Sequence, residues 1–534
     1  INPPSIGVAS FDGLDQFGNP YDNSALNTYG GADTLTSCPI NLFANSSGTP
    51  YSLSDSLFLS FYVQRKGIGD APEGGDSLKV EFYNPSDSVW KEQWSLQGGT
   101  DTIFQRIRVR VSDAKYLKKG FRFRFVNLAN LTGQLDHWHL DYVRLKTNIT
   151  LAIDTVLDDI AFTLPAVSLI KRYTSMPYSH YKALVPNQQN AMRNTLKLRV
   201  RNNSYQKRPI NSTNDRVYDP TGAAVFTNSQ SSNDIAGNSD STYFVTLTPF
   251  AYSPNFGDSA VFEVEHYIGL PADANKHNDT IRFRQEFYNY FAYDDGSAEA
   301  GYSINASGGK IAYGFTLLKP DTLRAVQIHF SQLNDDVSNK LFKLAVWKDI
   351  GLVGQEELIY EKINQKPVYV DSINGFATYG IPDTILTVSG NIFVGFIQNT
   401  ADFLNVGLDR NRINNNVMFY NTNGTWFQSQ VEGSWMIRPV FGDSIVFTGS
   451  GKDLVKKRGK IYPNPANSEF TFESPENIKW VTLRIFDMTG KLFKNSRVIN
   501  ESTINISDLK QGFYLVAFTD TNGQEYFHKL IISR

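Results

Sequence analysis

The strongest constraint on the fold is the alternation of apolar and polar residues in the C-terminal segment, residues 461–534. Its short runs are Phe470–Glu473, Val481–Asp487, Lys491–Val498, Phe513–Thr519 and Phe527–Ile532. The runs are separated by turn residues, including Met488-Thr489-Gly490 and Asn522-Gly523, which suit tight hairpins. Alternation with period two between such turns predicts a small, self-contained antiparallel sandwich.

Four motifs occur in order along this segment. They contain Tyr462, Pro463, Asn464 and Pro465, then Gly490 and Lys491, then Gly512, Phe513 and Tyr514, and finally Lys529. Together they resemble the type A C-terminal sorting domain of the Bacteroidota type IX secretion system. The resemblance implies export across the outer membrane, with the secretion translocon and an outer-membrane barrel shuttle as partners. It implies an extracellular or cell-surface location. From the residues alone, an ordinary immunoglobulin-like module is the alternative.

The composition favours an all-β protein. Phe (37), Tyr (27) and Trp (7) are abundant, and long helical periodicities are absent. The net charge of −2 provides no basic surface for nucleic acid. No run of apolar residues is long enough to span a membrane. The chain starts at Ile1 without a leader-like segment, so we expect a mature form from which a signal peptide has been removed.

The spacing of strand-like runs predicts tandem β-sandwich modules. We expect a jelly roll over residues 1–150, then an immunoglobulin-like sandwich over 151–290, with a long polar loop from Asn211 to Asp240. A second jelly-roll-like sandwich is predicted over 291–445, a linker over 446–460, and the C-terminal sorting domain over 461–534.

Two pieces of the first module carry a second resemblance. Ser10 to Asp15 and Asp136 to Leu145 are similar to the first and last strands of MAM and carbohydrate-binding-module jelly rolls. In those families an acidic residue of each strand often binds a structural calcium, which implies Asp12 and Asp141 here. The alternative is a turn residue and an outward strand residue. A weaker calcium candidate is Asp294, Asp295 and Glu299, within an Asp-Asp-Gly turn signal.

Motifs of known catalytic chemistry are absent from the sequence. There is no His-Glu-x-x-His, Gly-x-Ser-x-Gly or phosphate-binding glycine loop. His137 and His139 share one strand face, and we expect surface residues or supporting partners of the last strand rather than a zinc site. Cys38, the single cysteine, is predicted to be buried. A catalytic pair of carboxylates can come from distant strands and then has no sequence motif, so the absence of motifs does not exclude an enzyme.

The triplet of Asp, then Ser or Thr, then a small or apolar residue recurs before residue 450 more often than composition alone would give. It resembles the Bacteroidota O-glycosylation signal, in which the hydroxyl residue carries the glycan. The same triplet often occurs where a strand begins after a turn, and this explains part of the excess. The candidate residues are Thr34, Ser56, Ser77, Ser88, Thr102, Thr155, Ser241, Ser259, Thr280, Thr322, Ser372, Thr384 and Ser444.

These features favour a secreted, surface-displayed binding or adhesion protein. A surface glycan or another surface protein is the expected ligand. Five tryptophans are candidates for stacking on sugars, and the alternative is that most of them lie in the core: Trp90, Trp94, Trp138, Trp347 and Trp426. A structural component of a surface assembly and a secreted hydrolase with dispersed catalytic residues are the alternatives. The sequence names no ligand.

Overall fold

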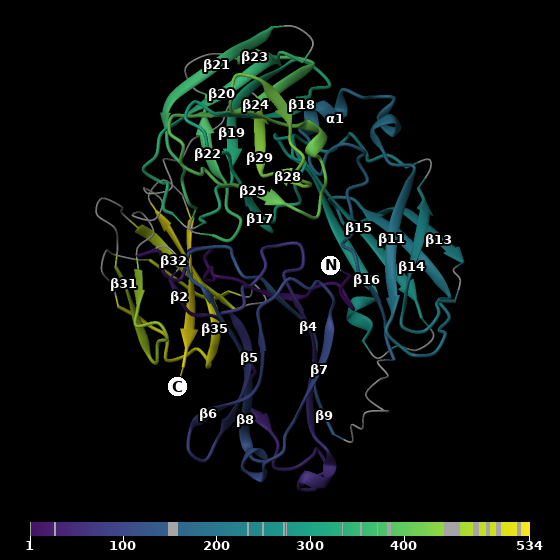
Figure 1. Cartoon of the computed structure of the whole chain (residues 1–534), viewed down its shortest axis with the longest axis vertical. Helices are drawn as coiled ribbons and strands as arrows, with labels where there is room; N and C mark the ends of the chain where they lie inside the picture. The colour runs from purple at the N-terminus through teal and green to yellow at the C-terminus, as the bar shows by residue number, and fades with distance from the viewer. Residues whose placement is uncertain are drawn as a thin grey trace. The chain divides into compact units, whose positions relative to one another are not determined.

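A computed structural model describes residues 2–25, 28–147, 158–231, 234–247, 250–270, 273, 275–333, 335–352, 355–370, 372–381, 386–442, 460–473, 480–487, 492–497, 503–520 and 525–533. The chain forms two compact units, Ile1–Ile445 and Val446–Arg534. Figure 1 shows that strands dominate the described residues. The all-β prediction is therefore confirmed.

The first module of the N-terminal unit consists of strands β1 to β9. One sheet has the order β1-β9-β4-β7, and the other has β2-β8-β5-β6 with β3 paired to β8. The strands are β1 (Ala9–Phe11), β2 (Tyr29–Thr36), β3 (Ile40–Asn41), β4 (Phe58–Arg65), β5 (Ser77–Asn84), β6 (Val89–Gln97), β7 (Gln105–Arg110), β8 (Lys119–Asn130) and β9 (Trp138–Lys146), with 3-10 turns η1 (Leu53–Asp55) and η2 (Ala114–Tyr116). In β5, Leu78, Val80 and Phe82 alternate inward, as period-two patterning requires.

The second module, β10 to β16, also has two sheets, β10-β11-β14 and β13-β12-β15-β16. Its elements are β10 (Ile160–Phe162), α1 (Tyr178–Lys182), η4 (Gln188–Ala191), β11 (Thr195–Asn202), β12 (Ser212–Tyr218), β13 (Ala224–Ser231), β14 (Ser239–Thr246), β15 (Ala260–Gly269), η5 (Lys276–Asn278) and β16 (Thr280–Phe287). The predicted polar loop from Asn211 to Asp240 is wrong, because β12 and β13 form a hairpin there. β13 is an edge strand without a buried side chain, so its sequence lacks apolar alternation.

The third module, β17 to β29, contains three sheets. Their orders are β17-β25-β28, β21-β20-β24-β18-β26-β27, and β22-β19-β23 with β29 paired to β19. The elements are β17 (Ala300–Tyr302), β18 (Lys310–Thr316), β19 (Asp321–Ile328), β20 (Phe342–Ile350), β21 (Glu356–Gln365), β22 (Ala377–Gly380), β23 (Leu386–Val388), β24 (Asn391–Gln398), β25 (Val406–Asp409), η6 (Asn415–Val417), β26 (Met418–Asn421), β27 (Trp426–Gln428), β28 (Ser434–Trp435) and β29 (Ile437–Phe441).

The second and third modules share one hydrophobic core. A continuous cluster of buried side chains runs from Ile160 to Phe441, whereas the first module has its own cluster from Phe11 to Leu140. Phe291 is fully buried in the shared core and packs against Tyr173 and Phe441. The strands of each sheet all come from a single predicted range. The chain nevertheless divides into only two compact units, with the boundary after residue 445. The boundaries near 150 and 290 stay predictions.

The C-terminal unit is a small two-sheet structure. Its sheets have the orders β30-β31-β34 and β33-β32-β35-β36. The strands are β30 (Lys460–Tyr462), β31 (Glu469–Glu473), β32 (Trp480–Asp487), β33 (Leu492–Arg497), β34 (Thr503–Asn505), β35 (Gly512–Asp520) and β36 (Glu525–Ile532). Phe470, Phe472, Ile485 and Phe518 fill the space between the sheets.

The single cysteine lies on the surface of the molecule. Cys38 is exposed, so the prediction of a buried cysteine is wrong; it lies in a short connection between β2 and β3, beside Pro39.

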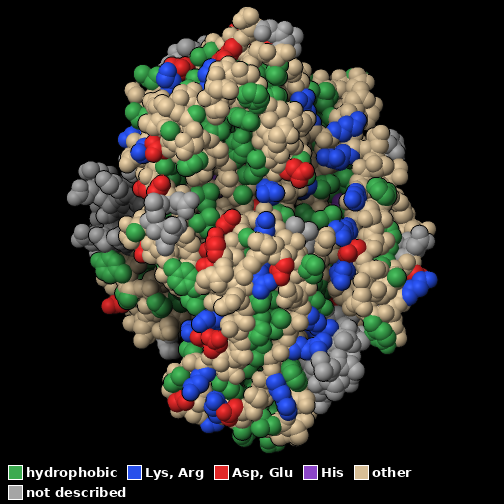
Figure 2. Space-filling view, in the orientation of Figure 1, with side chains coloured by type: hydrophobic (Ala, Val, Ile, Leu, Met, Phe, Trp, Pro, Cys, Tyr) green, Lys and Arg blue, Asp and Glu red, His purple; other side chains and the backbone are tan. Residues whose placement is uncertain are grey.

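In Figure 2 basic and acidic side chains are interspersed over the visible face. Among the described residues, no helix has the length and apolarity required to cross a membrane.

Candidate metal centre and the cleft beside it

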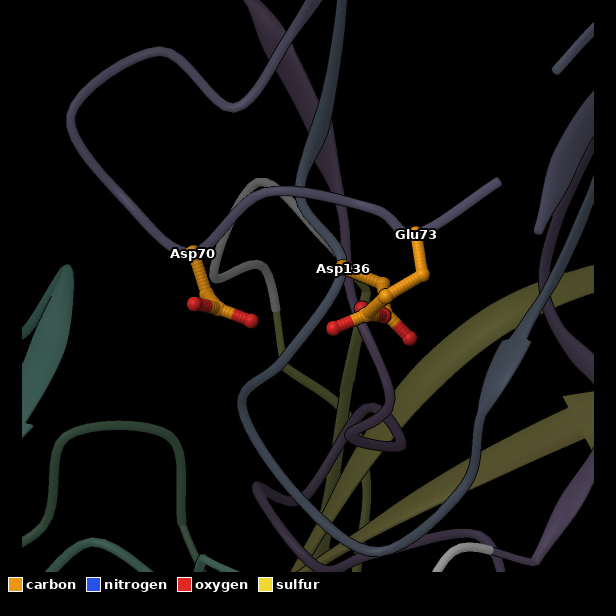
Figure 3. A group of neighbouring side chains, drawn as sticks. All are labelled: Asp70, Glu73 and Asp136. Carbon is orange, nitrogen blue, oxygen red and sulfur yellow. The ribbon is translucent and has the colours of Figure 1, made fainter. Parts of the chain in front are cut away.

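Three carboxylates of the first module converge between two loops. Asp70 and Glu73 lie in the loop that joins β4 to β5, and Asp136 lies in the loop that joins β8 to β9. Their ligand oxygens are all within 4.8 Å of one another. Figure 3 shows the three side chains directed toward a common space. Asp70 and Glu73 are exposed and Asp136 is buried, so the group is open to solvent on one side.

Backbone hydrogen bonds fix this geometry. The amide of Asn130 donates to Asp136 Oδ2 at 2.8 Å, and the amide of Glu73 donates to the carboxylate of Asp76. The amide of His137 donates to the Asp70 carbonyl at 3.1 Å, which joins the two loops. Asp76 is itself buried and supplies a fourth carboxylate beside the three.

The carboxylates repel one another in a desolvated position. Burial raises the pKa of Asp136 to about 8, and the neighbouring Glu73 and Asp76 add to the rise. Burial, again with repulsion from Glu73, raises the pKa of Asp76 to about 6. In the described part of the chain, none of these carboxylates is ion-paired with Lys or Arg. A bound cation would remove this repulsion.

The donor set is suited to calcium. Calcium takes six to eight oxygen ligands and tolerates irregular geometry, which two loops can provide together with water. The group contains no sulfur or nitrogen ligand, so zinc and other softer metals are disfavoured. Asp70, Glu73 and Asp136 would hold the ion.

We expect calcium to stabilise the protein more at pH 8 than at pH 5. The folded-state pKa of Asp136 lies above the ordinary value near 3.9, so its contribution to stability without metal is full below that value and is lost as pH rises toward 8. Calcium binds the ionised form, so its effect grows over the same range. At a hundredfold excess over Kd the gain is about 2.7 kcal/mol.

Thermal melting of chelator-treated protein, with and without calcium at both pH values, measures this dependence. Asp136→Asn is the matched control, because it keeps the shape of the side chain and removes the charge. The variant should show a smaller calcium shift at pH 8 than the native protein. An equal shift in the two proteins would exclude this centre.

His137 connects the candidate metal centre to a neighbouring cleft. Its Nδ1 accepts a hydrogen bond from the Asp70 amide at 3.0 Å, and its Nε2 lies 3.9 Å from Asp12 Oδ2. Burial lowers the pKa of His137 to about 4, so the ring is neutral at physiological pH. Of the two alternatives expected for His137 and His139, a surface position is wrong because both are buried and their rings stack; a supporting role for the last strand stays a prediction.

The cleft has a volume of about 600 Å³ and lies between the first and third modules. Asp12, Asp15, Asp33 and Tyr21 line one wall. Polar and apolar side chains of the third module line the other wall, among them Gln332, Tyr369, Ile373 and Asn374. Among the described residues, no Lys or Arg lines the cleft.

Gln134 links the loop of the metal centre to the third module. It lines the cleft, and its Nε2 donates to the carbonyl of Ala298. A β-bridge between Gly133 and Leu333 supports the same contact. Because Asp136 lies in this loop, an ion there would order one side of the cleft.

Hydrogen bonds hold Asp12 and Asp33 next to each other in the cleft. The amide of Asp12 donates to Asp33 Oδ2 at 2.9 Å, and the Tyr21 hydroxyl donates to Asp33 Oδ1 at 2.9 Å. The amide of Leu14 donates to Asp12 Oδ1 at 2.8 Å. Burial raises the pKa of Asp12 to about 7, and it also raises the pKa of Asp33.

The structure does not bring together Asp12 and Asp141, which corrects the pairing expected from the sequence. Phe11 lies opposite Trp138 in the β1–β9 ladder, which places Asp12 beside His137 and Asp141 four positions further along β9. At about 3.3 Å per residue the separation is roughly 13 Å. Asp141 accepts hydrogen bonds from the amide and hydroxyl of Ser5 instead.

Protein donors occupy the weaker calcium candidate. Arg438 forms a two-pronged ion pair with Asp294, and Glu299 accepts from the Arg410 amide at 2.8 Å and from Asn411 Nδ2 at 2.9 Å. Asp295 Oδ1 accepts from the amide and hydroxyl of Ser297. These partners occupy several of the carboxylate oxygens, and calcium at this group stays a prediction.

Most of the tryptophans expected to stack on sugars belong to the interior. Trp138 and Trp347 are fully buried, so that expectation is wrong for them. Trp94 packs edge-on against Phe61, and Trp426 packs edge-on against Trp347. Trp90 is half-buried, with Arg124 over its ring. The cleft is lined by tyrosine rather than by tryptophan.

The described residues of the predicted glycosylation set are all accessible. Thr34, Ser88, Ser259 and Ser372 are exposed. Ser56, Ser77, Thr102, Ser241, Thr280 and Thr322 are partly buried. Thr155, Thr384 and Ser444 lie outside the described residues. O-glycosylation stays a prediction.

Three of the four sorting motifs lie next to one another in the C-terminal unit. Asn464 Oδ1 accepts from the Ile531 amide at 2.9 Å, and Ala466 exchanges backbone hydrogen bonds with Ile531 and Ser533. The first motif therefore binds the end of the last strand. Tyr462, Pro463 and Pro465 are exposed. In the β35–β36 ladder Gly512 pairs with Ile532, Phe513 with Ile531 and Leu515 with Lys529. Tyr514 is buried, whereas Gly490 and Lys491 lie outside the described residues.

Comparison with known proteins agrees with this arrangement. Residues 460–533 match the family described as "Secretion system C-terminal sorting domain". The C-terminal unit thus marks the chain as cargo for export across the outer membrane to the cell surface or beyond. A curated relative, "Endo-acting ulvan lyase" of Formosa agariphila, is 39% identical over 77 residues. That match covers 14% of this chain and 14% of the relative, so this chain spans a small part of its length.

Solved structures give no further assignment. A putative β-galactosidase of Bacteroides fragilis has a TM-score of 0.21 and 13% identity, over 55% of this chain and 37% of that chain. β-Glucuronidase 2 of Bacteroides uniformis has a TM-score of 0.21 and 11% identity, over 54% of this chain and 31% of that chain. Similarity this low carries no argument about activity.

Proposed function

We propose that the N-terminal unit is a calcium-stabilised binding module displayed at the cell surface, and that its ligand is a neutral glycan. The observation that carries the proposal is the cleft between the first and third modules. Its volume of about 600 Å³ is within the ordinary range for ligand sites. The resemblance that Ser10 to Asp15 and Asp136 to Leu145 bear to carbohydrate-binding-module jelly rolls points to the same class of ligand.

The chemistry of the walls favours polyhydroxylated ligands. Carboxylates can accept hydrogen bonds from sugar hydroxyls, and side-chain amides and hydroxyls can both donate and accept them. Tyr21 and Tyr369 offer flat apolar faces. Asp12, Asp15 and Asp33 make the cleft acidic, and among the described lining residues no Lys or Arg offsets them. Uronates and sulfated sugars would therefore be repelled, which selects neutral sugars.

Binding of full-length protein to an array of neutral and acidic glycans tests the proposal. Neutral glycans should bind, and Tyr21→Ala should weaken that binding at least tenfold, or about 1.4 kcal/mol. Tyr205→Ala is the matched control, because Tyr205 is exposed on the second module and does not line the cleft. Equal losses in both variants, or a preference for acidic glycans, would contradict the proposal.

A hydrolase is the second candidate, and Asp12 with Asp33 is the observation that favours it. A carboxyl group with its pKa raised to about 7 can act as a general acid, and the Asp33 carboxyl is the candidate second group beside it. Asp12→Asn should then abolish hydrolysis of the glycan, whereas binding of the glycan persists. Binding without turnover in the native protein favours the binding module.

A further inference from the structure

Ser10 and His139 form a hydrogen-bonded pair at the wall of the cleft. Ser10 of β1 lies directly opposite His139 of β9 in the ladder, so the two side chains project from the same face of the sheet. Ser10 Oγ lies 2.8 Å from His139 Nδ1. Ser10 is exposed and lines the cleft, whereas His139 is buried. A hydroxyl group that a ligand in the cleft can reach is therefore in contact with a buried imidazole.

The backbone carbonyl of Lys66 fixes the tautomer of this imidazole. His139 Nε2 lies 3.2 Å from the Lys66 carbonyl oxygen. A carbonyl oxygen only accepts hydrogen bonds, so the proton of the neutral ring lies on Nε2. Burial lowers the pKa of His139 to about 4, so the ring is neutral near pH 7. Nδ1 therefore carries a lone pair and accepts the hydrogen bond that the Ser10 hydroxyl donates.

The loop that follows β4 fits closely around the ring. Gly67 has a φ of +58°, and a Cβ atom at this position would lie 2.3 Å from His139 Nε2. A larger residue would displace the imidazole, so glycine is required for the Lys66 carbonyl to approach it. A serine hydroxyl, an imidazole and a group that orients the imidazole are the parts by which a base activates a serine nucleophile.

A second serine–histidine pair lines the same cleft but has a buried hydroxyl. Ser331 Oγ lies 3.3 Å from His329 Nε2, and His329 Nδ1 lies 2.7 Å from the Gly375 carbonyl oxygen. The serine–histidine distance is longer than at Ser10, and Ser331 is only 5% exposed. Of these two pairs, that of Ser10 combines the base with an exposed hydroxyl.

We propose that Ser10 is the nucleophile, and His139 the general base, of an esterase that removes acyl groups from the neutral glycan. The inference rests on the proposed function, because the cleft must first hold the glycan. A base with a low pKa drives proton transfer weakly, which favours esters over amides with their poorer leaving groups. Glycosidic bonds stay intact, so this activity is separate from the one considered for Asp12 and Asp33.

The reaction needs no group beyond the serine, the histidine and water. Ser10 Oγ forms a bond to the acyl carbon while its proton passes to His139 Nδ1. The tetrahedral centre then expels the sugar oxygen, which takes that proton and leaves as a hydroxyl group. Water attacks the acyl-serine through the same transfers, which releases a carboxylic acid and restores Ser10. Gln16, Gln332 and Asn374 line the cleft, and their amide groups are the candidates to donate hydrogen bonds to the oxyanion.

Labelling of the full-length protein with a fluorophosphonate probe, followed by mass spectrometry of its peptides, tests the inference. Such a probe bonds to an activated serine oxygen with loss of fluoride, so the adduct should lie on Ser10. Ser10→Ala and His139→Gln should each slow labelling, and hydrolysis of 4-methylumbelliferyl acetate, by about a hundredfold or more. Ser10 is exposed, so Ser10→Ala should keep the thermal melting profile of the native protein and carries the test even where His139→Gln unfolds.

Ser331→Ala is the matched control, because Ser331 contacts a histidine at the same cleft but is buried. It should leave labelling unchanged. An adduct on another residue, or equal labelling of the native protein and Ser10→Ala, would overturn the inference. Ser10→Ala should still bind neutral glycans. Glycan binding without an adduct on Ser10 refutes the esterase alone, whereas an adduct on Ser10 without glycan binding refutes the proposed ligand.

Discussion

Removal of residues 525–534 is expected to abolish export and leave the protein in the periplasm. These residues contain β36, which pairs with β35 along eight positions from Gly512–Ile532 to Thr519–Glu525. Leu530 and Ile532 fill the core of the C-terminal unit, and Ile531 holds Asn464 of the first sorting motif. The truncation therefore removes an edge of the sheet, part of its core and the contact between the first and last motifs. Cell fractionation with surface protease treatment measures the outcome.

Two substitutions separate loss of folding from loss of the signal. Phe470 is fully buried in the C-terminal unit, and Phe470→Ala should cost about 3–5 kcal/mol and reduce export strongly. Leu515, in β35, is partly exposed, and Leu515→Ala should leave export close to normal. A fusion of residues 455–534 to a passenger should be exported. Surface display of the truncated protein would show that the C-terminal unit is not required.

The all-β class could be predicted from the sequence because alternation with period two is a local signal. Each run of alternating residues carries its own evidence, as in β5, where Leu78, Val80 and Phe82 face inward. Because the prediction depends on this local alternation, the sequence does not predict the hairpin of β12 and β13. Its second strand buries no side chain, so its residues read as a polar loop.

The candidate sites could be predicted only in part because they depend on tertiary contacts. Asp70, Glu73 and Asp76 lie in one acidic, glycine-containing loop, which is a weak local signal. Asp136 joins them only through the pairing of loops that are distant in the sequence. The resemblance implied Asp12 and Asp141 as a pair; β1 and β9 are neighbours, but the register places the two carboxylates at different levels. The cleft likewise combines residues separated by about three hundred positions, beyond the reach of pattern analysis.

The shared core raises the question of whether the predicted boundary near residue 290 separates two folding units. Tyr290 bridges Val440, Ser175 bridges Ala292, and the amide of Phe291 donates to the Pro439 carbonyl at 3.2 Å. The backbone around residue 290 thus contributes hydrogen bonds to both modules. Physical coupling of this kind argues that the second and third modules unfold together.

Phe291→Ala is therefore expected to destabilise both modules by about 3–5 kcal/mol in one transition. The ring is fully buried, with its centroid 4.7 Å from that of Tyr173, 5.0 Å from that of His180 and 5.6 Å from that of Phe441. Its removal would leave a cavity between side chains of the two modules. Hydrogen exchange with mass spectrometry, followed on peptides of β11 and β20, should show equal losses of protection.

Phe244→Ala is the matched control for this prediction. Phe244 lies in β14 of the second module with its side chain exposed, so its removal should change stability by less than about 0.5 kcal/mol. If Phe291→Ala weakens protection in only one of the two peptides, the modules fold independently and the boundary near residue 290 is a true domain boundary. Equal losses in both would instead show that residues on either side of it fold as one body, with Phe291 among the side chains that join them.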